Sequence, residues 1–254
     1  MTRILAVVPA RMSSSRFPGK PLEQINGIPM IAHCYFRAIQ AKQITKVVLA
    51  TPDEEIMEFG KRFGIETVLT SNKHERATER AEEALQIYKK QGEEYDYVLL
   101  LQGDEPQIDP QEIDNLAIAL QSGSNCVVNI IHPIQGDDMQ NPSVVKSILD
   151  SHGNILFFSR AHIPYKSDSG YRQLGMIGFT AKILEKYCQL EPTPMEITES
   201  IDMMRFLEND IAISSLMTHT SIIGVDHPED IKKVESLMAD DELVKEYSNL
   251  FIKK

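Results

Sequence analysis

Short apolar runs alternate with helical patterns through the first half of the chain, and this alternation limits the fold more than any other feature of the sequence. Strands are expected at Ile4–Val8, Lys46–Ala50, Glu66–Thr70 and Tyr97–Leu101. Helices are expected at Pro29–Gln40, Glu54–Phe63, Ala77–Lys90 and Pro110–Gln121. Because these strands are almost continuously apolar, both faces of their sheet must be covered. The pattern therefore predicts an α/β fold with a parallel sheet flanked by helices.

The second half of the chain is less regular and richer in strand patterns. Strands are expected at Asn125–Ile131, Val144–Leu149, Ile155–Phe158, Leu174–Phe179 and Ile211–Leu216. Helices are expected at Ala181–Leu190, Glu196–Glu208 and Glu229–Glu246. The 254 residues contain no internal repeat and no strong linker, so one domain is predicted. In this domain the second half adds a smaller β-rich lobe and a surface for dimerisation.

The charge balance and the cysteines restrict the class of protein. A net charge of −11 excludes a nucleic-acid-binding surface built on bulk positive charge, so the cations for an anionic substrate must be clustered locally. The three cysteines have no metal-ligand spacing and are expected to be reduced thiols. No run reaches the roughly 18 apolar residues of a membrane span, and the N-terminal apolar run is too short for a signal peptide. A cytoplasmic protein without nucleic-acid or membrane partners is expected.

A basic loop follows the first expected strand, where the ligands of open α/β sheets bind. Its sequence is Pro9-Ala10-Arg11-Met12-Ser13-Ser14-Ser15-Arg16-Phe17-Pro18-Gly19-Lys20-Pro21-Leu22. The three cations and three serine hydroxyls of this loop suit the oxygens of a phosphate, although the Walker A pattern is absent. A solvated basic loop is the alternative, but a cation cluster behind a buried strand in an acidic chain favours phosphate binding.

Two acidic segments lie far apart in the chain. Gln102-Gly103-Asp104-Glu105-Pro106 follows the apolar strand Tyr97–Leu101, and a carboxylate at such a strand end can hold a hard cation. A turn that uses Gly103 and Asp104 only for their backbone geometry is an equally acceptable interpretation. The second segment, Gly224-Val225-Asp226-His227-Pro228-Glu229-Asp230, has by itself the composition of a helix start.

The basic loop resembles the sugar-nucleotidyltransferase signature P-A-R-x-x-S-[ST]-R-x-P-G-K-P-L, and it looks most like the branch of the CMP-KDO synthetases (3-deoxy-manno-octulosonate cytidylyltransferases). Both acidic segments also resemble this family, in which the second one reads G-V-D-T-P-E-D. The resemblance implies a Rossmann-like, mostly parallel sheet, with CTP as a substrate and Mg²⁺ as the cofactor. It implies that Gln102 reads the cytosine and that Asp104 and Asp226 bind Mg²⁺. The implied catalytic residues are Arg11, Lys20, Asp104 and Asp226. The implied nucleotide contacts are Pro9, Ala10, Arg11, Ser13, Ser14, Lys20, Gln102 and Asp104.

Further matches extend over nearly the whole chain, and the departures gather where the family holds its sugar. The matching runs are Asn141-Pro142-x-x-Val145-Lys146, Phe157–Pro164 and Thr78-Glu79-Arg80. The family's S-G before T-E-R is Arg76-Ala77 here. A His and a Tyr of the family's sugar site are Gln173 and Ile177, and its Glu and Gln are Asp202 and Met203. The resemblance implies a sugar site with altered specificity, made by Arg80, Arg160, Gln173, Asp202 and Met203. Ile177 and Met203 are also acceptable as plain core residues.

The reaction that the resemblance implies is an in-line attack of the sugar's anomeric hydroxyl on the α-phosphorus of CTP, with pyrophosphate as the leaving group. Residues 1–125 would form the nucleotide-binding part of the domain. Residues 126–254 would form the sugar-binding part and the contact of a homodimer. The expected acidic sugar is 3-deoxy-manno-octulosonate or a modified form such as its 8-amino analogue. A nine-carbon acidic sugar and a catalytically silent nucleotide-binding homologue are the alternatives.

Overall fold

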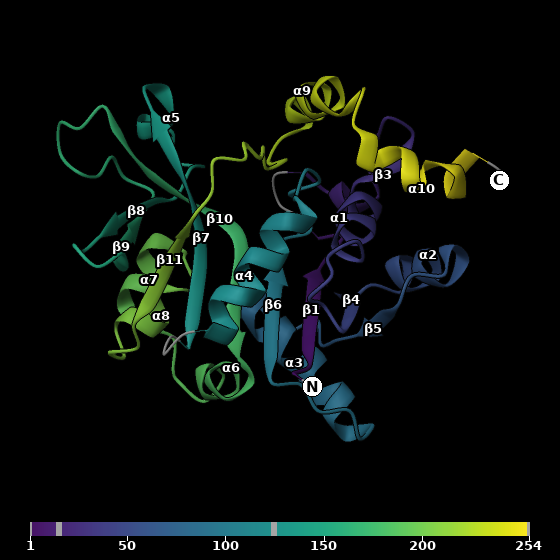
Figure 1. Cartoon of the computed structure of the whole chain (residues 1–254), viewed down its shortest axis with the longest axis horizontal. Coiled ribbons are helices and arrows are strands. Elements are labelled where there is room, and N and C mark those ends of the chain that lie inside the picture. The colour runs from purple at the N-terminus through teal and green to yellow at the C-terminus, as the bar shows by residue number, and fades with distance from the viewer. Residues whose placement is uncertain (1, 14–16, 123–125, 253–254) are drawn as a thin grey trace.

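The computed structural model describes residues 2–13, 17–122 and 126–252, and it has the expected α/β architecture (Figure 1). The strands are β1 (Ile4–Pro9), β2 (Gln24–Ile25), β3 (Ile28–Pro29), β4 (Lys46–Thr51), β5 (Thr67–Leu69), β6 (Tyr97–Leu101), β7 (Val127–Gln135), β8 (Lys146–Leu149), β9 (Asn154–Ser159), β10 (Ser169–Thr180) and β11 (Ile213–Met217). Within the described residues, nine strands form one sheet in the order β5-β4-β1-β6-β10-β7-β11-β9-β8, and β2 pairs with β3 in a separate hairpin.

Helices cover both faces of the sheet. The helices of the described residues are η1 (Lys20–Leu22), α1 (Met30–Ala38), α2 (Glu54–Phe63), α3 (Ala77–Lys90), α4 (Pro110–Ser122), α5 (Asp137–Gln140), α6 (Ala181–Tyr187), α7 (Pro194–Glu199), α8 (Met204–Leu207), α9 (Pro228–Met238) and α10 (Glu242–Ile252), and not all of them lie on the sheet. Alternate residues of β1 face opposite sides, so that Ala6 and Val8 pack with α1 and α4, while Leu5 and Val7 pack with α3 and α6. In the part of the chain that the structure describes, no helix is both long and apolar enough to cross a membrane.

Parallel pairing is concentrated where helices connect the strands. β5, β4, β1 and β6 pair in parallel, as the alternating pattern predicts. β10 then pairs antiparallel with both β6 and β7, and β11 lies parallel to β7. The remaining described pairs of the second half, β8–β9, β8–β10 and β9–β11, are antiparallel. A short turn joins β8 to β9, so these two strands must run in opposite directions. The sheet is therefore parallel through its first half and mixed through its second.

The second half closes into the β-rich lobe that the sequence predicts. β8 pairs with both β9 and β10, and β7 pairs with both β10 and β11. Since β11 also pairs with β9, these strands form a closed ring, which lies beside the parallel part in Figure 1. β10 belongs to both parts, so it places residues of the lobe next to the carboxyl end of β6.

Two of the expected helices are each two helices in the structure. The segment expected as Glu196–Glu208 is α7 and α8, which are separated at Ser200, whose φ of 55° lies in the left-handed region. The segment expected as Glu229–Glu246 is α9 and α10, and between them Asp241 binds Arg37 of α1 at 2.8 Å. In both segments contacts with other elements override the helical pattern.

A buried histidine ties α1 to the C-terminal helix. His33 is completely buried; its Nδ1 lies 2.7 Å from the Tyr247 hydroxyl and its Nε2 lies 3.0 Å from the Ile25 carbonyl oxygen. A carbonyl oxygen only accepts, so Nε2 carries the proton and Nδ1 accepts from the tyrosine. Burial lowers the pKa of His33 to about 4, because the charged ring would lose its solvation.

Acidification is expected to destabilise the wild-type protein more than a His33→Gln variant. The unfolded chain binds the proton near pH 6.5 and the folded chain only near pH 4, so this stabilisation is present above pH 6.5 and is lost as the pH falls toward 4. Between about pH 7 and 5 the wild type should lose roughly 2 kcal/mol more of its free energy of unfolding. Urea unfolding of both proteins measures this difference, and an equal pH dependence would contradict a neutral His33.

Candidate functional site

The loops that follow β1 and β6 border a cavity of about 280 Å³, which we call the small cavity. Of the expected nucleotide contacts, it gathers Pro9, Ala10, Arg11, Lys20, Gln102 and Asp104. Ser13 is exposed on the same loop and is not among the described residues that line this cavity, and Ser14 lies outside the described residues. The start of α3 contributes a further wall through its N-cap residue Arg76 and through Arg80. The basic loop therefore faces a cavity with cations from two elements.

Lys20 joins the two acidic segments. Its Nζ donates to Asp104 Oδ2 at 2.8 Å and to the Val225 carbonyl at 2.7 Å. The backbone N–H of Val225 donates in turn to the Asp104 carbonyl at 2.9 Å. These bonds bring Asp226, the residue after Val225, to the loop that carries Asp104, although the two carboxylates are far apart in the sequence.

A second cavity of about 540 Å³, the large cavity, extends from the same loops into the β-rich lobe. Its lining includes these expected site residues: Gln102, Asp104, Arg160, Gln173, Asp202 and Asp226. Gln102 and Asp104 line both cavities. A ligand in the small cavity and a ligand in the large cavity would therefore meet at the loop after β6, which is the arrangement that a transfer between two substrates requires.

Gln102 is fixed by the neighbouring strand β10. Its backbone N–H donates to the Gly175 carbonyl at 2.8 Å, and the Gly175 N–H donates to Glu105 Oε1 at 2.9 Å. A Cβ at Gly175 would lie 2.6 Å from the Cβ of Gln102, so only glycine leaves room for this side chain. A Cβ at Gly103 would lie 2.6 Å from the Pro9 carbonyl oxygen. The two glycines thus let three backbone segments approach closely at the junction of the cavities.

The carboxylates at this junction suit a hard cation. Burial raises the pKa of Glu105 to about 7, and the charges of Asp104 and Asp226 add to the shift, so all three carboxyl groups lie near this junction. Among the described residues, no group of three or more His, Cys, Asp or Glu side chains is placed to bind a metal. Two carboxylates nevertheless fit Mg²⁺, which keeps several waters and takes phosphate oxygens as its other ligands.

The large cavity contains groups suited to an acidic ligand. The Arg160 guanidinium donates to the carbonyls of Glu199 and Pro142 at 3.0 and 3.1 Å. These neutral acceptors fix the guanidinium without cancelling its charge, so the charge can bind a carboxylate. Gln173 Nε2 donates to the side-chain oxygen of Asn129 at 2.6 Å, which orients its amide at the wall of the cavity.

Two of the expected sugar contacts lie elsewhere. Met203 is completely buried in the hydrophobic core that contains α3 and α6, so it is a core residue and not a residue of either cavity. Ile177 is buried in the same core. Arg80 lines the small cavity instead of the large one and donates to the Thr70 hydroxyl at 2.5 Å. Burial lowers the pKa of Arg80, and the nearby positive charge of Arg11 adds to this shift. Arg80 therefore lies close to the basic loop.

The sequence reasoning assigned no role to two cations of the lobe. Arg172 of β10 lines the large cavity. Lys146 is completely buried and donates to the carbonyls of Asn141, Val144 and Arg160 at 2.8, 2.7 and 2.7 Å, so it holds the loop beside the cavity. A lysine is almost never fully buried unless its ammonium group has specific partners. The position of Lys146 inside an expected strand was therefore a signal in the sequence that this side chain makes structural contacts.

The sequence matches the family described as Cytidylyltransferase over residues 5–214. The 3-deoxy-manno-octulosonate cytidylyltransferase of Nitratiruptor sp. is 36% identical over 239 residues, which cover 91% of this chain and 98% of that protein. The mitochondrial 3-deoxy-manno-octulosonate cytidylyltransferase of Arabidopsis thaliana is 38% identical over 245 residues, which cover 93% of this chain and 83% of that protein. The resemblance found in the sequence is therefore confirmed.

Solved structures agree with these matches. The structure of a CMP:2-keto-3-deoxy-manno-octonic acid synthetase complexed with CTP has a TM-score of 0.87 and 33% identity, over 94% of this chain and 100% of that chain. A cytidylyltransferase from Leptospira borgpetersenii has a TM-score of 0.64 at 16% identity, and it shares the fold. The chain therefore belongs to the cytidylyltransferase family.

Proposed function

We propose that this protein transfers CMP from CTP to 3-deoxy-manno-octulosonate and releases pyrophosphate. The observation that carries the proposal is the meeting of two cavities at Gln102 and Asp104, in a chain 33% identical to a synthetase whose structure holds CTP. The small cavity offers cations for a triphosphate, and the large cavity offers Arg160 for the carboxylate of an acidic sugar. The Nitratiruptor and Arabidopsis relatives are named for the same reaction.

In this reaction the anomeric oxygen of the sugar bonds to the α-phosphorus, the bond from that phosphorus to the bridging oxygen of pyrophosphate breaks, and the hydroxyl proton passes to water. Lys20 and Arg11 would neutralise the charge that grows on the leaving group. Asp104 and Asp226 would hold Mg²⁺, which orients the phosphates and acidifies the attacking hydroxyl. Gln102 would present its amide donor and acceptor to the cytosine.

A modified octulosonate such as the 8-amino analogue, or a nine-carbon acidic sugar, is the alternative acceptor. Gln173 and Asp202 stand at the large cavity where the family motif has His and Glu, and these changes motivate the alternative. A catalytically silent homologue is the second alternative. The presence of both Asp104 and Asp226 argues against it. A homodimer and a cytoplasmic location complete the proposal, and light scattering after size-exclusion chromatography tests the dimer.

Pyrophosphate release from CTP tests the proposed function. The assay compares 3-deoxy-manno-octulosonate, its 8-amino analogue and a nine-carbon acidic sugar, each with Mg²⁺ and with EDTA. The expected result is pyrophosphate release with 3-deoxy-manno-octulosonate, and EDTA should abolish this release. Release with another sugar alone would keep CMP transfer and reassign the acceptor, and CTP binding without release would indicate a silent homologue. Asp104→Asn keeps the size of the side chain and is expected to abolish release.

Gly175→Ala is expected to raise the KM for CTP by about tenfold while the fold is retained. The new Cβ would displace Gln102, so that one hydrogen bond to the base, worth about 1.4 kcal/mol, is lost. Gly170→Ala is the matched control in the same strand, because its new Cβ would meet chiefly the flexible end of Met139, at 3.1 Å. Steady-state kinetics measure both variants. An unchanged KM in Gly175→Ala would contradict the role of Gln102 in recognising the base.

A further inference from the structure

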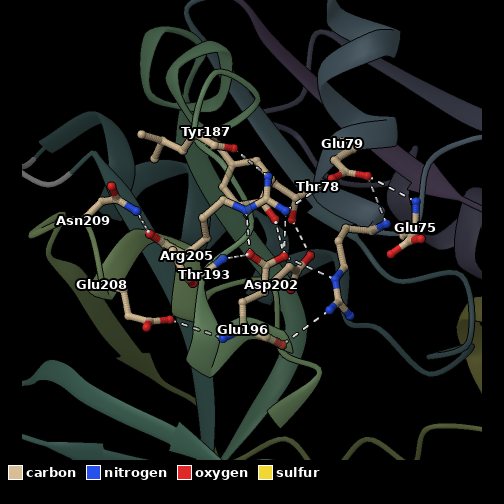
Figure 2. A network of polar contacts seen from close by, with 12 residues as sticks. Glu75, Thr78, Glu79, Tyr187, Thr193, Glu196, Asp202, Arg205, Glu208 and Asn209 are labelled. Atoms are coloured by element: carbon tan, nitrogen blue, oxygen red, sulfur yellow. Dashed lines mark hydrogen bonds and ion pairs between the residues drawn. The ribbon is translucent and has the colours of Figure 1, made fainter. Parts of the chain in front are cut away.

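The first turn of α3 lies between the two cavities and contacts the walls of both. Arg76 and Ala77 line the small cavity, whereas Asp202, which accepts a hydrogen bond from Thr78, lines the large cavity. Figure 2 shows Thr78, Asp202 and Glu196 within one network of polar contacts. The network therefore connects the side of the molecule proposed to bind the nucleotide with the side proposed to bind the sugar.

The hydrogen bond between Thr78 and Asp202 is short, and its donor is buried. Thr78 is completely buried, and its hydroxyl oxygen lies 2.5 Å from Asp202 Oδ2. A hydroxyl that donates to a carboxylate makes a stronger bond than one that donates to a neutral acceptor. Because threonine is branched at Cβ, its side chain has few rotamers in a helix, and α3 itself sets the direction of the hydroxyl. The bond therefore fixes one oxygen of Asp202, and with it the orientation of the carboxylate.

The segment that precedes Asp202 is clamped to the same turn of α3. Arg76 Nη1 donates to the Ser200 hydroxyl at 3.0 Å, and Arg76 Nε lies 3.3 Å from Glu196 Oε1. Glu196 is 1% exposed and accepts from two nitrogens of Arg205 at 2.6 and 2.7 Å. Arg205 belongs to α8 and also lies 3.3 Å from Glu79 of α3, so a shift of α7 and α8 along α3 would break the ionic contacts of both Arg76 and Arg205. Residues 196–202 therefore keep one position relative to the small cavity.

We infer that Thr78 is a positioning residue, which orients the Asp202 carboxylate toward a hydroxyl group of the acceptor sugar. The inference rests on the proposed function, in which the large cavity takes the sugar. An ionised carboxylate has only acceptor oxygens, so Asp202 suits a ligand group that donates a hydrogen bond. A carboxylate that is already oriented loses less conformational freedom when the ligand binds. The turn that borders the nucleotide thus also shapes the site for the sugar.

A double-mutant cycle tests this inference. Thr78→Val keeps the size and branching of the side chain but removes the hydroxyl, and Thr78→Ser keeps the hydroxyl. The expected result for Thr78→Val is a KM for the sugar about tenfold higher, with kcat and the KM for CTP within about twofold of wild type. Thr78→Ser is expected to recover most of the loss. Since Thr78 acts through Asp202, Thr78→Val should have no further effect on the sugar in an Asp202→Ala background.

Each contrary outcome is distinguishable. A wild-type KM for the sugar in Thr78→Val, or an equal rise in the KM values of both substrates, would overturn the inference. An effect of Thr78→Val that persists without Asp202 would also overturn it. Should Thr78→Val fail to fold, Thr78→Ala carries the same comparison. A wild-type protein that releases no pyrophosphate with any acidic sugar would count against the proposed function instead, and the dissociation constant of 3-deoxy-manno-octulosonate, measured by calorimetry across the same variants, would then decide the role of Thr78.

Discussion

Lys20→Met is expected to lower kcat for pyrophosphate release by about 10²–10³-fold, the usual effect of removing one donor that stabilises charge in a transition state. The Lys20 side chain is 12% exposed, and its Nζ bonds to both Asp104 and the Val225 carbonyl. Its charge is therefore held at the junction of the two cavities before any substrate arrives. Methionine keeps the apolar stem of the side chain and removes only the ammonium group.

The same substitution is expected to lower the Mg²⁺ concentration that gives half-maximal activity. The Lys20 ammonium lies 2.8 Å from Asp104 Oδ2, so it opposes a second cation at that carboxylate. A Mg²⁺ titration of the wild type and Lys20→Met measures this effect together with kcat. Lys245→Met is the control, because Lys245 is 64% exposed and pairs with Glu242 on the surface. An unchanged kcat, or a higher Mg²⁺ requirement, would contradict the assigned role of Lys20.

Glu196→Ala is expected to lower the free energy of unfolding by about 3–5 kcal/mol. Glu196 and Arg205 are 1% and 3% exposed, and they form a bidentate ion pair at 2.6 and 2.7 Å (Figure 2). The substitution would leave the guanidinium buried, and among the described residues its one remaining ionic partner would be the more distant Glu79 carboxylate, at 3.3 Å. The large cost comes from the desolvated charge that remains, because the pair itself gains little over an apolar contact.

Glu242→Ala is the matched control for this stability experiment. Glu242 is 83% exposed and pairs with Lys245, so its loss is expected to change the free energy of unfolding by less than about 1 kcal/mol. Urea unfolding near neutral pH measures both variants. The double substitution Glu196→Leu with Arg205→Met should recover much of the lost stability, since it removes both buried charges. Equal losses in the free energy of unfolding for Glu196→Ala and Glu242→Ala would show that the buried ion pair contributes no more to stability than the exposed one.

The parallel part of the sheet and the residues at its edge could be predicted from the sequence, because both depend on local patterns. Lys20 and Asp104 lie on loops that follow apolar strands, and the carboxyl ends of parallel strands meet at one edge of a sheet. The structure accordingly brings their side chains within 2.8 Å of each other. Asp226 could be assigned only through the family resemblance, since its own segment is indistinguishable from a helix start.

The residues on the sugar-binding side of the site could not be predicted in the same way, because their positions depend on long-range contacts that no local sequence pattern contains. The segment 196–208 has a helical pattern, but Ser200 adopts a left-handed conformation and its hydroxyl binds Arg76, so the helix breaks there. After this break Asp202 lines the large cavity, while Met203 packs into the core. Two adjacent residues thus have opposite environments, and neither the spacing nor a motif alignment reveals which of them faces the ligand.

The two backbone hydrogen bonds of Val225 make the junction of the cavities depend on a segment from the far end of the sequence. Its N–H and carbonyl dock the chain beyond β11 onto Asp104 and Lys20, and α9 is anchored nearby by two hydrogen bonds between Asn26 and Glu235. Val225 lies 205 residues after Lys20 in the sequence, so these bonds form only when both ends of the chain have folded together. Because the described strand pairs of the sheet end with β11, local unfolding of the segment that follows would separate Asp226 from Asp104 without breaking the sheet.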